Sequence, residues 1–409
     1  MTKRVAVTGM AGISALGNDW PAIRDRMLAG ETATRSMPQW DHLQDLDTRL
    51  AAPADHFAHE KAYPRKKMRS MGRVATLAVS AAEKALQDAD LIDDPVLTSG
   101  RTGVSCGSSY GSTEPARDFV KFLESGKAGS LNATSYVRMM NHTSPVNIGV
   151  FFQLRGRVIT TSSACTSGSQ GIGYAFEAIR HGYADVMIAG GAEELCPSMA
   201  AVFDTLYATS TRNDDPGIAS RPFDADRDGL VIGEGSAILI LEEYEHARER
   251  GAEIIVELVG FATNSDGAHI TQPMQATQAL AMREALTMAG ITPDAVGFIS
   301  GHGTATELGD IAESRATSEV YGDKVPFHSL KGHFGHTLGA CGALEAWLAL
   351  EMRREGWFAG TANLQRVDER CGALDYVQGA GGRKIDCEYV VSNNFAFGGI
   401  NTSLVFRAT

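Results

Sequence analysis

The sequence lacks a long run of apolar residues. The best candidate for such a run, residues 158–176, is rich in Ser, Thr and Gly, whereas a membrane-spanning helix needs about 20 predominantly apolar residues. The apolar segment at residues 5–17 is short, rich in β-branched residues and broken by glycines, so it predicts a buried strand and not a signal peptide. We therefore expect a protein that does not insert into a membrane.

Basic residues are also in short supply. The chain has 37 Lys and Arg against 49 Asp and Glu, a formal net charge of −12, which argues against nucleic acid as a partner. An acidic partner needs a local basic patch, and the segment YPRKKMRSMGR offers one with Arg65, Lys66, Lys67, Arg69 and Arg73. On charge alone, this segment is either a solvated helix face or a docking site.

Metal-binding and nucleotide-binding motifs are missing as well. The six cysteines show no C-x-x-C spacing, which excludes a zinc knuckle or a small disulfide framework and favours reduced thiols in the cytoplasm. There is no Walker motif, and Gly168, Gly171 and Gly173 are not followed, at the expected distance, by the acidic residue of a dinucleotide site. We expect neither a metal nor a nucleotide cofactor.

Short β-branched runs alternate with longer amphipathic segments along the chain. With 44% hydrophobic and 21% charged residues, the chain can bury a substantial core, and the alternation predicts a layered α/β fold with buried strands. After Gly251 the same order begins again, with a strand over 253–264, a helix over 278–290 and a strand from 295. We therefore predict two related halves, residues 1–251 and residues 252–409.

Cys165 lies in the segment TTSSACTSGSQG, between a predicted strand and a helix predicted over residues 167–180, which Gly182 closes. A thiol at this turn is expected to be exposed and to feel the positive end of the helix dipole, while free backbone N–H groups hold a developing anion. These features suit a nucleophile. The alternative is that Cys165 is a small buried residue of the core.

Two histidines lie in later Gly-rich turns. His302 directly follows a predicted strand, and His336 precedes a predicted helix. α/β folds place catalytic groups on such loops, and the helix N-terminus is expected to keep His336 neutral. A hydrogen-bonded structural role is the alternative for each, and it is the preferred one for His328 and His333. A metal site is not expected, because no carboxylate or thiol stands at zinc-binding spacing from these histidines.

A serine hydrolase is an alternative enzyme class. Residues 107–111, GSSYG, match the G-x-S-x-G motif and follow a predicted strand. A nucleophile elbow needs a helix that begins directly after the serine, whereas the segment STEP, which ends at Pro115, intervenes here. We therefore do not expect Ser109 to be a nucleophile.

Five segments together resemble, in order and spacing, the signatures of elongating β-ketoacyl-acyl carrier protein synthases of the type I/II class. They are SACTSGSQGIG from residue 163, RPFDADRDGLVIGEG from 221, HGTATELGD from 302, KGHFGHTLGACGALE from 331 and SNNFAFGGIN from 392. The resemblance covers nearly the whole chain. It implies a dimer with a thiolase-like fold, in which two similar α/β halves, each with a mixed five-stranded sheet, give an α-β-α-β-α layering.

The resemblance also implies the catalytic residues. Cys165 corresponds to the acylated nucleophile of the family, and His302 and His336 complete a Cys-His-His set. Lys331 and Glu345 correspond to a buried ion pair beside this set.

Further positions follow from the same resemblance. Phe397 corresponds to a gating aromatic whose backbone N–H joins that of the nucleophile in an oxyanion hole. Tyr110 is expected either to limit the depth of the acyl pocket or to pack at a subunit interface. The other positions implied to bind substrate are Leu230 and Phe395, for the acyl chain and its gate, and Thr304 and Thr306, for the phosphopantetheine arm. The positions implied to support the site from behind are Asp310, Glu313 and Asn401.

The implied reaction is a decarboxylative Claisen condensation in fatty acid biosynthesis. An acyl chain held on Cys165 is joined to malonyl-acyl carrier protein, which gives 3-oxoacyl-acyl carrier protein and CO₂. No cofactor is implied beyond the phosphopantetheine of the carrier protein. The family docks this acidic protein through a basic patch, here Arg65, Lys66, Lys67 and Arg69. The expected assembly is a homodimer, or a heterodimer with a non-catalytic chain-length partner.

Four positions depart from the usual pattern of the family, namely Leu230, Asn394, Ala396 and Ile400. All four are expected near the mouth or gate of the pocket, so the chemistry is retained while the preferred substrate differs. A ketosynthase of a specialised polyene or polyketide pathway is therefore an alternative to one of fatty acid elongation. A non-catalytic chain-length subunit is disfavoured, because Cys165 and both histidines are retained.

Overall fold

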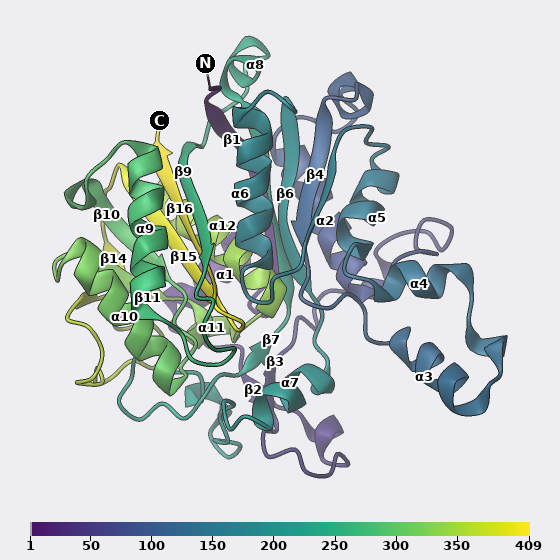
Figure 1. The fold of residues 1–409 in the computed structure, drawn as a ribbon, viewed down its shortest axis with the longest axis horizontal. Helices are drawn as coiled ribbons and strands as arrows, with labels where there is room; N and C mark the ends of the chain where they lie inside the picture. The colour runs from purple at the N-terminus through teal and green to yellow at the C-terminus, as the bar shows by residue number, and fades with distance from the viewer. Residues whose placement is uncertain (1) are drawn as a thin grey trace.

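The computed structural model describes residues 2–409, which form a mixed eleven-stranded sheet covered by helices (Figure 1). The strands of the first half lie in the order β1 (Val5–Ser14), β8 (Gly235–Glu243), β6 (Val186–Glu193), β4 (Thr102–Gly107) and β5 (Val158–Thr161). Those of the second half lie in the order β9 (Val256–Ser265), β16 (Ile400–Ala408), β15 (Tyr389–Ala396), β10 (Val296–Gly301), β11 (Pro326–Ser329) and β13 (Asp375–Tyr376). A small three-stranded sheet consists of β2 (Arg35–Ser36), β3 (Leu50–Ala52) and β7 (Ile232–Gly233). A two-stranded sheet consists of β12 (Trp357–Phe358) and β14 (Arg383–Lys384).

The two halves repeat one topology. In the first half β5, β4 and β6 are parallel, and β8 and β1 follow in antiparallel pairing. In the second half β11, β10 and β15 are parallel, and β16 and β9 follow in antiparallel pairing. β1 and β9 pair through two residues each, which joins the two sheets. The prediction of two similar halves with mixed five-stranded sheets is confirmed, and β13 adds a two-residue strand at one edge.

Helices cover both sheets and separate them. The outer helices of the first half are α2 (Arg73–Asp88) and α5 (Thr143–Phe151), and those of the second half are α9 (Gln275–Ala289) and α10 (Glu307–Tyr321). Between the halves lie α6 (Ser167–Arg180) and α12 (Cys341–Arg354), and α12 contacts both β8 and β15. The layers therefore have the expected order α-β-α-β-α. The remaining helices are α1 (Trp20–Leu28), α3 (Ala116–Ser125), α4 (Ala133–Met139), α7 (Pro197–Asp204), α8 (Tyr244–Glu249) and α11 (Lys331–Phe334).

The two central helices meet at their N-terminal ends. α6 occupies the residues for which the sequence predicts a helix, 167–180. At Gly168, in its first turn, a Cβ atom would lie 3.0 Å from the carbonyl oxygen of Gly339 and 2.9 Å from the backbone nitrogen of Ala343. Glycine therefore permits a contact between the start of α6 and the start of α12 that a larger residue would prevent. This contact brings the segments around Cys165 and His336 together.

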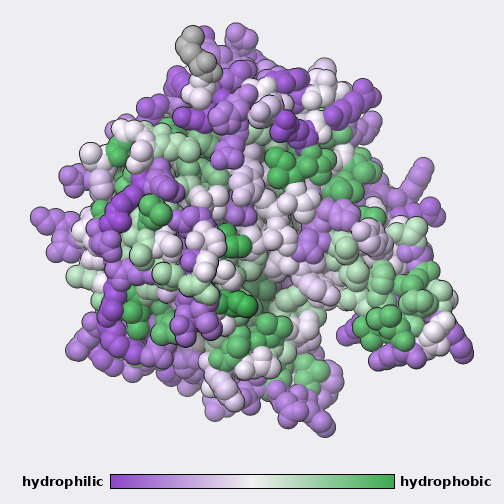
Figure 2. Space-filling view, viewed as in Figure 1, coloured by the Kyte–Doolittle hydropathy of each residue, from purple (hydrophilic) through white to green (hydrophobic). Residues whose placement is uncertain are grey.

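Apolar residues also occur on the surface of the first half. α3 and α4 project from the body of the molecule as an arm (Figure 1), and Figure 2 shows apolar residues in green on this arm. Leu123 and Tyr136 of the arm are 80% and 52% exposed. β5 forms one edge of the main sheet, and its Val158 is exposed as well. None of the helices in residues 2–409 combines the length with the apolar composition that a membrane span requires.

The predicted division at residue 251 falls in the connection between α8 and β9. As the boundary of two domains it stays a prediction.

Candidate active site

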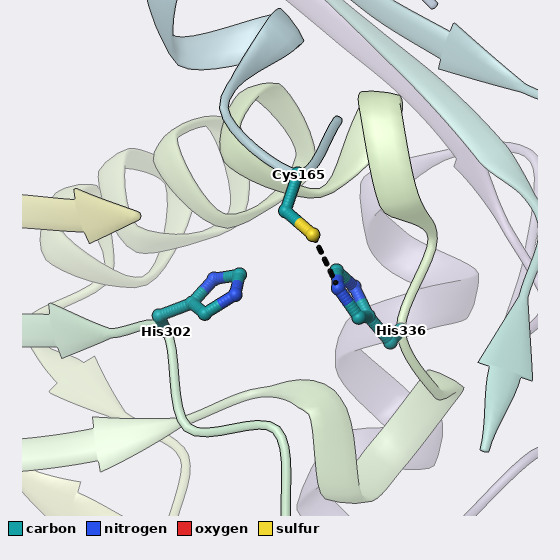
Figure 3. Close-up of side chains that lie close together, drawn as sticks. All are labelled: Cys165, His302 and His336. Atoms are coloured by element: carbon teal, nitrogen blue, oxygen red, sulfur yellow. Dashed lines mark hydrogen bonds between the residues drawn. The ribbon is translucent and has the colours of Figure 1, made fainter. Parts of the chain in front are cut away.

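Three segments that are far apart in the sequence bring Cys165, His302 and His336 together (Figure 3). Cys165 lies in the turn before α6, His302 follows β10, and His336 lies between α11 and α12. The Sγ atom of Cys165 is 3.0 Å from Nε2 of His336. One side-chain N or S atom from each of the three residues lies within 4.8 Å of the other two. The residues that the sequence proposed as a set are therefore neighbours in space.

The turn that carries Cys165 has an unusual backbone. Ala164 has a φ of 51°, in the left-handed region that residues other than glycine rarely adopt. The backbone N–H of Thr166 donates to the carbonyl oxygen of Ser163, and that of Ser167 donates to that of Ala164. This tight turn ends at the start of α6 and directs the side chain of Cys165 toward His336, as Figure 3 shows.

Two buried carboxylates hold the loop that carries His302. Glu313 accepts the backbone N–H groups of His302 at 2.5 Å and Gly303 at 2.7 Å. Asp310 accepts those of Thr304 at 2.9 Å and Ala305 at 3.1 Å. Both carboxylates lie on α10, so this helix determines the path of the loop. The prediction that Asp310 and Glu313 lie behind the site agrees with these contacts.

Lys331 and Glu345 form the expected buried ion pair. Nζ of Lys331 donates to Oε1 of Glu345, to the carbonyl oxygen of His302 at 2.6 Å, and to Nδ1 of His302 at 3.1 Å. Each donor of the ammonium group therefore has an acceptor, which is the condition under which a charge is tolerated in a protein interior.

Hydrogen bonds assign the same tautomer to both histidines. Nδ1 of His302 accepts from Lys331, and Nδ1 of His336 faces the backbone N–H of Leu338 at 3.3 Å. A neutral imidazole with an accepting Nδ1 carries its proton on Nε2. Burial, and then the charge of Lys331, lower the pKa of both histidines well below 6.5. Two neutral Nε2–H donors result. The sequence attributed the neutral state of His336 to the helix N-terminus. In the structure, burial and the charge of Lys331 account for it.

The environment of the Cys165 thiol differs from the one that the sequence predicts. The thiol is buried, with only 3% of the residue exposed, and burial raises its pKa to about 11. The backbone N–H groups of Phe397 and of Cys165 itself oppose this rise, as does the charge of Lys331. The prediction of an exposed thiol is therefore wrong. The resting residue is a thiol, and the two N–H groups and Lys331 favour the thiolate.

Phe397 lies on the turn between β15 and β16, where Gly398 and Gly399 have φ angles of 95° and 77°. Its ring packs edge-on against Phe203 of α7, with 5.8 Å between the ring centroids. Its backbone N–H is directed at the Cys165 thiol, which is where an oxyanion hole needs a donor. The glycines give this turn the backbone freedom that a gate requires.

The family of the chain follows from comparison with known proteins. The beta-ketoacyl synthase N-terminal domain matches residues 2–247, and the beta-ketoacyl synthase C-terminal domain matches residues 255–365. The chain belongs to the beta-ketoacyl synthase family. It is 36% identical over 412 residues to the 3-oxoacyl-[acyl-carrier-protein] synthase 2 of Vibrio cholerae, with 99% of both chains covered. A solved beta-ketoacyl synthase of Burkholderia phymatum is 56% identical over the whole of both chains, with a TM-score of 0.97.

Two further solved structures of similar proteins contain partners. One is the acyl-carrier protein of a type II polyketide synthase in complex with its ketosynthase, at 28% identity, full coverage of both chains and a TM-score of 0.87. The other is a ketosynthase of Xenorhabdus doucetiae in complex with its chain length factor, at 26% identity and a TM-score of 0.85. That match covers all of this chain and 98% of the other.

The predicted substrate-binding residues of this β-ketoacyl synthase lie at different depths. The hydroxyls of Thr304 and Thr306 are 2.8 Å apart, and Thr306 is partly exposed. The ring of Phe395 is 6.4 Å from that of His302. Leu230 is buried in a cluster with Leu338, the residue whose N–H faces His336. The same cluster is packed against Phe203, which contacts Phe397, so the role of Leu230 at the gate stays a prediction.

Asn401 lies at the start of β16, and Tyr110 lies on the turn after β4. Nδ2 of Asn401 donates to Asn264 and Asp266, and Asp266 in turn donates its backbone N–H to Gly399, in the turn that carries Phe397. Tyr110 is 39% exposed on the turn after β4, and its contact with an acyl chain stays a prediction. α3 begins only at Ala116, so the segment around Ser109 does not form a nucleophile elbow.

The expected basic patch is exposed but is not helical. Residues 65–70 form turns, so a helix face is excluded. The exposed side chains are Arg65, Lys66, Lys67 and Arg69, and Nζ of Lys67 lies 4.2 Å from the centre of the Phe151 ring. Arg73 does not belong to the patch, because its guanidinium pairs with the buried Glu234 at 2.5 and 2.9 Å.

His328 and His333 have the structural roles expected of them. Nδ1 of His328 contacts the carbonyl oxygen of Ala359 at 2.7 Å, and the ring nitrogens of His333 contact the carbonyl oxygens of Glu31 and Gly360. Both rings are buried.

The sequence did not identify two residues that lie next to the candidate site, Cys341 and Asn394. Sγ of Cys341 lies 3.2 Å from the carbonyl oxygen of Cys165. Asn394 was expected near the mouth, but it is fully buried and contacts His302 and Glu345. The signal was present for Asn394, because it departs from the usual residue of its motif. Position in a motif does not reveal which way a strand residue points.

Proposed function

We propose that the protein is a β-ketoacyl-acyl carrier protein synthase of the Cys-His-His type. The convergence of the Cys165 thiol with the Nε2–H groups of His302 and His336 carries this proposal. The proposed reaction joins an acyl chain on Cys165 to the two-carbon unit left when malonyl-acyl carrier protein loses CO₂. The products are 3-oxoacyl-acyl carrier protein and CO₂.

The first half-reaction transfers the acyl chain. The sulfur of Cys165 attacks the thioester carbonyl of an acyl-carrier protein, the bond from that carbonyl to the pantetheine sulfur breaks, and the thiol proton leaves with the pantetheine sulfur. The tetrahedral oxyanion accepts hydrogen bonds from the backbone N–H groups of Cys165 and Phe397. Their direction toward Sγ supports this role.

The second half-reaction forms the new carbon–carbon bond. The bond between the malonyl carbon and its carboxylate breaks, CO₂ leaves, and the electron pair gives a thioester enolate. The enolate oxygen accepts the Nε2–H groups of His302 and His336, which are neutral because their pKa values are lowered. The enolate carbon then attacks the acyl carbonyl, the bond to Sγ breaks, and Cys165 is released as a thiolate.

The substrates arrive on a carrier protein, and no separate cofactor takes part in this scheme. Thr304 and Thr306 are the proposed contacts of the phosphopantetheine arm, since their paired hydroxyls lie on the loop that follows His302. Arg65, Lys66, Lys67 and Arg69 are the proposed docking patch for the acidic carrier protein. Their exposure supports this role. The location of this chemistry is proposed to be the cytoplasm.

The active assembly is proposed to be a dimer. β5 is an edge strand with the exposed apolar Val158, and the arm of α3 and α4 exposes Leu123 and Tyr136. Edge strands and apolar patches of this kind are normally covered in an assembly. The partner is a second copy of this chain or a sister chain without the nucleophile. A second copy corresponds to fatty acid elongation, and a sister chain corresponds to a specialised pathway.

A specialised polyene or polyketide pathway is the second candidate beside fatty acid elongation. The observation that favours it is the similarity over the whole chain to the Xenorhabdus doucetiae ketosynthase that was solved with its chain length factor. Expression alone and size determination by light scattering separate the two cases. A stable, active homodimer supports fatty acid elongation, and a chain that needs a sister subunit supports the specialised pathway.

Mass spectrometry of the intact protein tests the proposed function. The wild-type protein is incubated with acyl-carrier proteins of graded chain length and saturation, and we expect one acyl adduct on Cys165. Cys165→Ala should form no adduct and no condensation product, whereas Cys165→Gln, which imitates an acylated sulfur, should still decarboxylate malonyl-carrier protein. An adduct on another residue in Cys165→Ala would overturn the assignment, and the preferred acyl chain identifies the pathway.

A further inference from the structure

The amide of Asn394 closes a ring of contacts behind His302. Nδ2 of Asn394 lies 2.6 Å from Oε2 of Glu345 and 3.3 Å from Nδ1 of His302. Lys331 contacts the other oxygen of Glu345 and the same Nδ1 atom. The two oxygens of one carboxylate therefore orient two donors, and both donors face a single ring nitrogen. All four side chains are buried.

The two donors differ in one chemical respect. An ammonium group in a low-dielectric site can pass its proton to a neighbouring carboxylate, and the resulting amine has a lone pair that can accept a hydrogen bond. If Lys331 became such an amine, it would no longer exclude a proton from Nδ1 of His302. The amide nitrogen of Asn394 has no acceptor lone pair and donates at every physiological pH.

The orientation of the amide follows from its surroundings. If the amide were rotated, Oδ1 would face Oε2 of Glu345 and the lone pair of Nδ1 of His302, so three acceptors would meet. In the orientation observed, Oδ1 has no hydrogen-bond partner among residues 2–409. The amide thus leaves its own oxygen unpaired in order to direct Nδ2 at Glu345 and His302, and a buried unpaired oxygen normally persists only where something else compensates for it.

We propose that Asn394 is a positioning residue that keeps His302 in its Nε2–H tautomer whatever the protonation state of Lys331. Asn394 acts on the ring of His302 and does not touch the reacting atoms. Its importance for catalysis rests on the proposed function, in which the Nε2–H of His302 stabilises the enolate. Loss of this control affects decarboxylation and not the transfer of acyl groups to Cys165.

The test compares Asn394→Asp with Asn393→Ala. Asn394→Asp keeps the shape but replaces the donor by an acceptor, which attracts a proton to Nδ1 of His302 and reverses the tautomer. Asn393 is also buried on β15 but lies on the opposite face of the strand, because successive residues alternate. Asn393→Ala therefore controls for loss of a buried amide without a change at His302. Where Asn394→Asp does not fold, Asn394→Ala takes its place in a Lys331→Met background, so that neither donor to Nδ1 of His302 remains. Lys331→Met alone is then the control, and thermal unfolding is measured alongside.

The primary measurement is the ¹⁵N NMR spectrum of histidine-labelled protein, with the signals of His302 identified from their loss in His302→Ala. We expect the Nε2–H pattern in the wild type and in Asn393→Ala, and the Nδ1–H or protonated pattern in Asn394→Asp. We also expect Asn394→Asp to lower kcat for decarboxylation by about a hundredfold, the effect of losing one oxyanion donor. Its KM for malonyl-carrier protein and its rate of Cys165 acylation should stay within about threefold of the wild type.

Two results would overturn the inference: an unchanged tautomer in the Asn394 variant, or equal loss of acylation and decarboxylation in it. The NMR pattern does not depend on turnover. If the wild type neither acylates Cys165 nor decarboxylates malonyl-carrier protein, the proposed function fails, while the tautomer comparison still decides the role of Asn394.

Discussion

Substitution of the buried ion pair of Lys331 and Glu345 distinguishes its contribution to the free energy of unfolding from its contribution to decarboxylation. Lys331→Met leaves the carboxylate of Glu345 buried without its cation, and Glu345→Leu leaves the ammonium of Lys331 without its anion. Breaking a buried pair in this way costs about 3–5 kcal/mol of the free energy of unfolding. We expect each single variant to lose this amount.

The double variant Lys331→Met/Glu345→Leu removes both charges. Its remaining defects are the carbonyl oxygen of His302, which loses the 2.6 Å hydrogen bond from Lys331, and one N–H of Asn394, which loses the 2.6 Å hydrogen bond to Glu345. An unpaired buried neutral group costs about 1–3 kcal/mol, and no unpaired charge is left, so the double variant should be more stable than either single one. Its decarboxylation should stay low, because the donor from Lys331 to Nδ1 of His302 is lost and Asn394 is left without its carboxylate.

Urea unfolding followed by circular dichroism, together with release of labelled CO₂ from malonyl-carrier protein, measures the two effects. Glu319→Ala is the matched control, since the Arg283–Glu319 pair is exposed and its loss should cost no more than about 1 kcal/mol. A double variant as unstable as the single ones would refute the argument about buried charge. Full recovery of decarboxylation in it would refute the role of Lys331 in holding His302.

Three further predictions concern pH, docking and chain length. Because the pKa values of His302 and His336 lie well below 6.5, both rings stay neutral donors as the pH falls from 7 to 6, and the decarboxylation rate should not drop there. The unfolded chain binds protons at these histidines near pH 6.5 and the folded chain does not, so the free energy of unfolding should decrease below that pH. A decarboxylation rate that halves near pH 6.5 would contradict the first statement, and acid titration of stability checks the second. Reversal of Arg65 and Lys66 to Glu should raise KM for carrier-bound substrate and flatten its salt dependence, with little change for a small pantetheine thioester; equal losses with both substrates would mean that the patch supports folding. Tyr110→Ala should shift the preferred acyl donor toward longer chains, by about 0.8 kcal/mol for each methylene newly buried, and an unchanged chain-length profile in a folded dimer would reject this role.

Much of the fold can be read from local patterns. β-branched runs predict the strands, because a strand covered on both faces must be apolar along its length. The segment from Ser167 to Arg180 predicts α6 to the residue, since its start and its closing glycine are both local signals. The return of the same pattern after Gly251 predicts the second half. Each of these signals depends on neighbours within a few positions, which is what a single sequence displays.

The site could be predicted as a set of residues, but its chemical state could not. The motifs name Cys165, His302 and His336, because each lies at a turn where a strand or helix ends. Burial then raises the pKa of Cys165 and lowers those of the histidines, whereas the local pattern predicted an exposed thiol. Burial is a property of all layers together, and no single motif contains it.

Hydrogen bonds between residues of distant segments are visible only in the tertiary structure. Arg73 leaves the basic patch because Glu234, far along the chain, accepts its guanidinium. Asn394 reaches His302 across 92 positions because β15 lies beside β10 in the sheet. A hydrogen bond requires atoms within about 3 Å, and only the packing of strands and helices within each half brings such residues that close. The sequence by itself therefore determined which residues form the candidate site, while the packed structure decided their protonation, their tautomers and their neighbours.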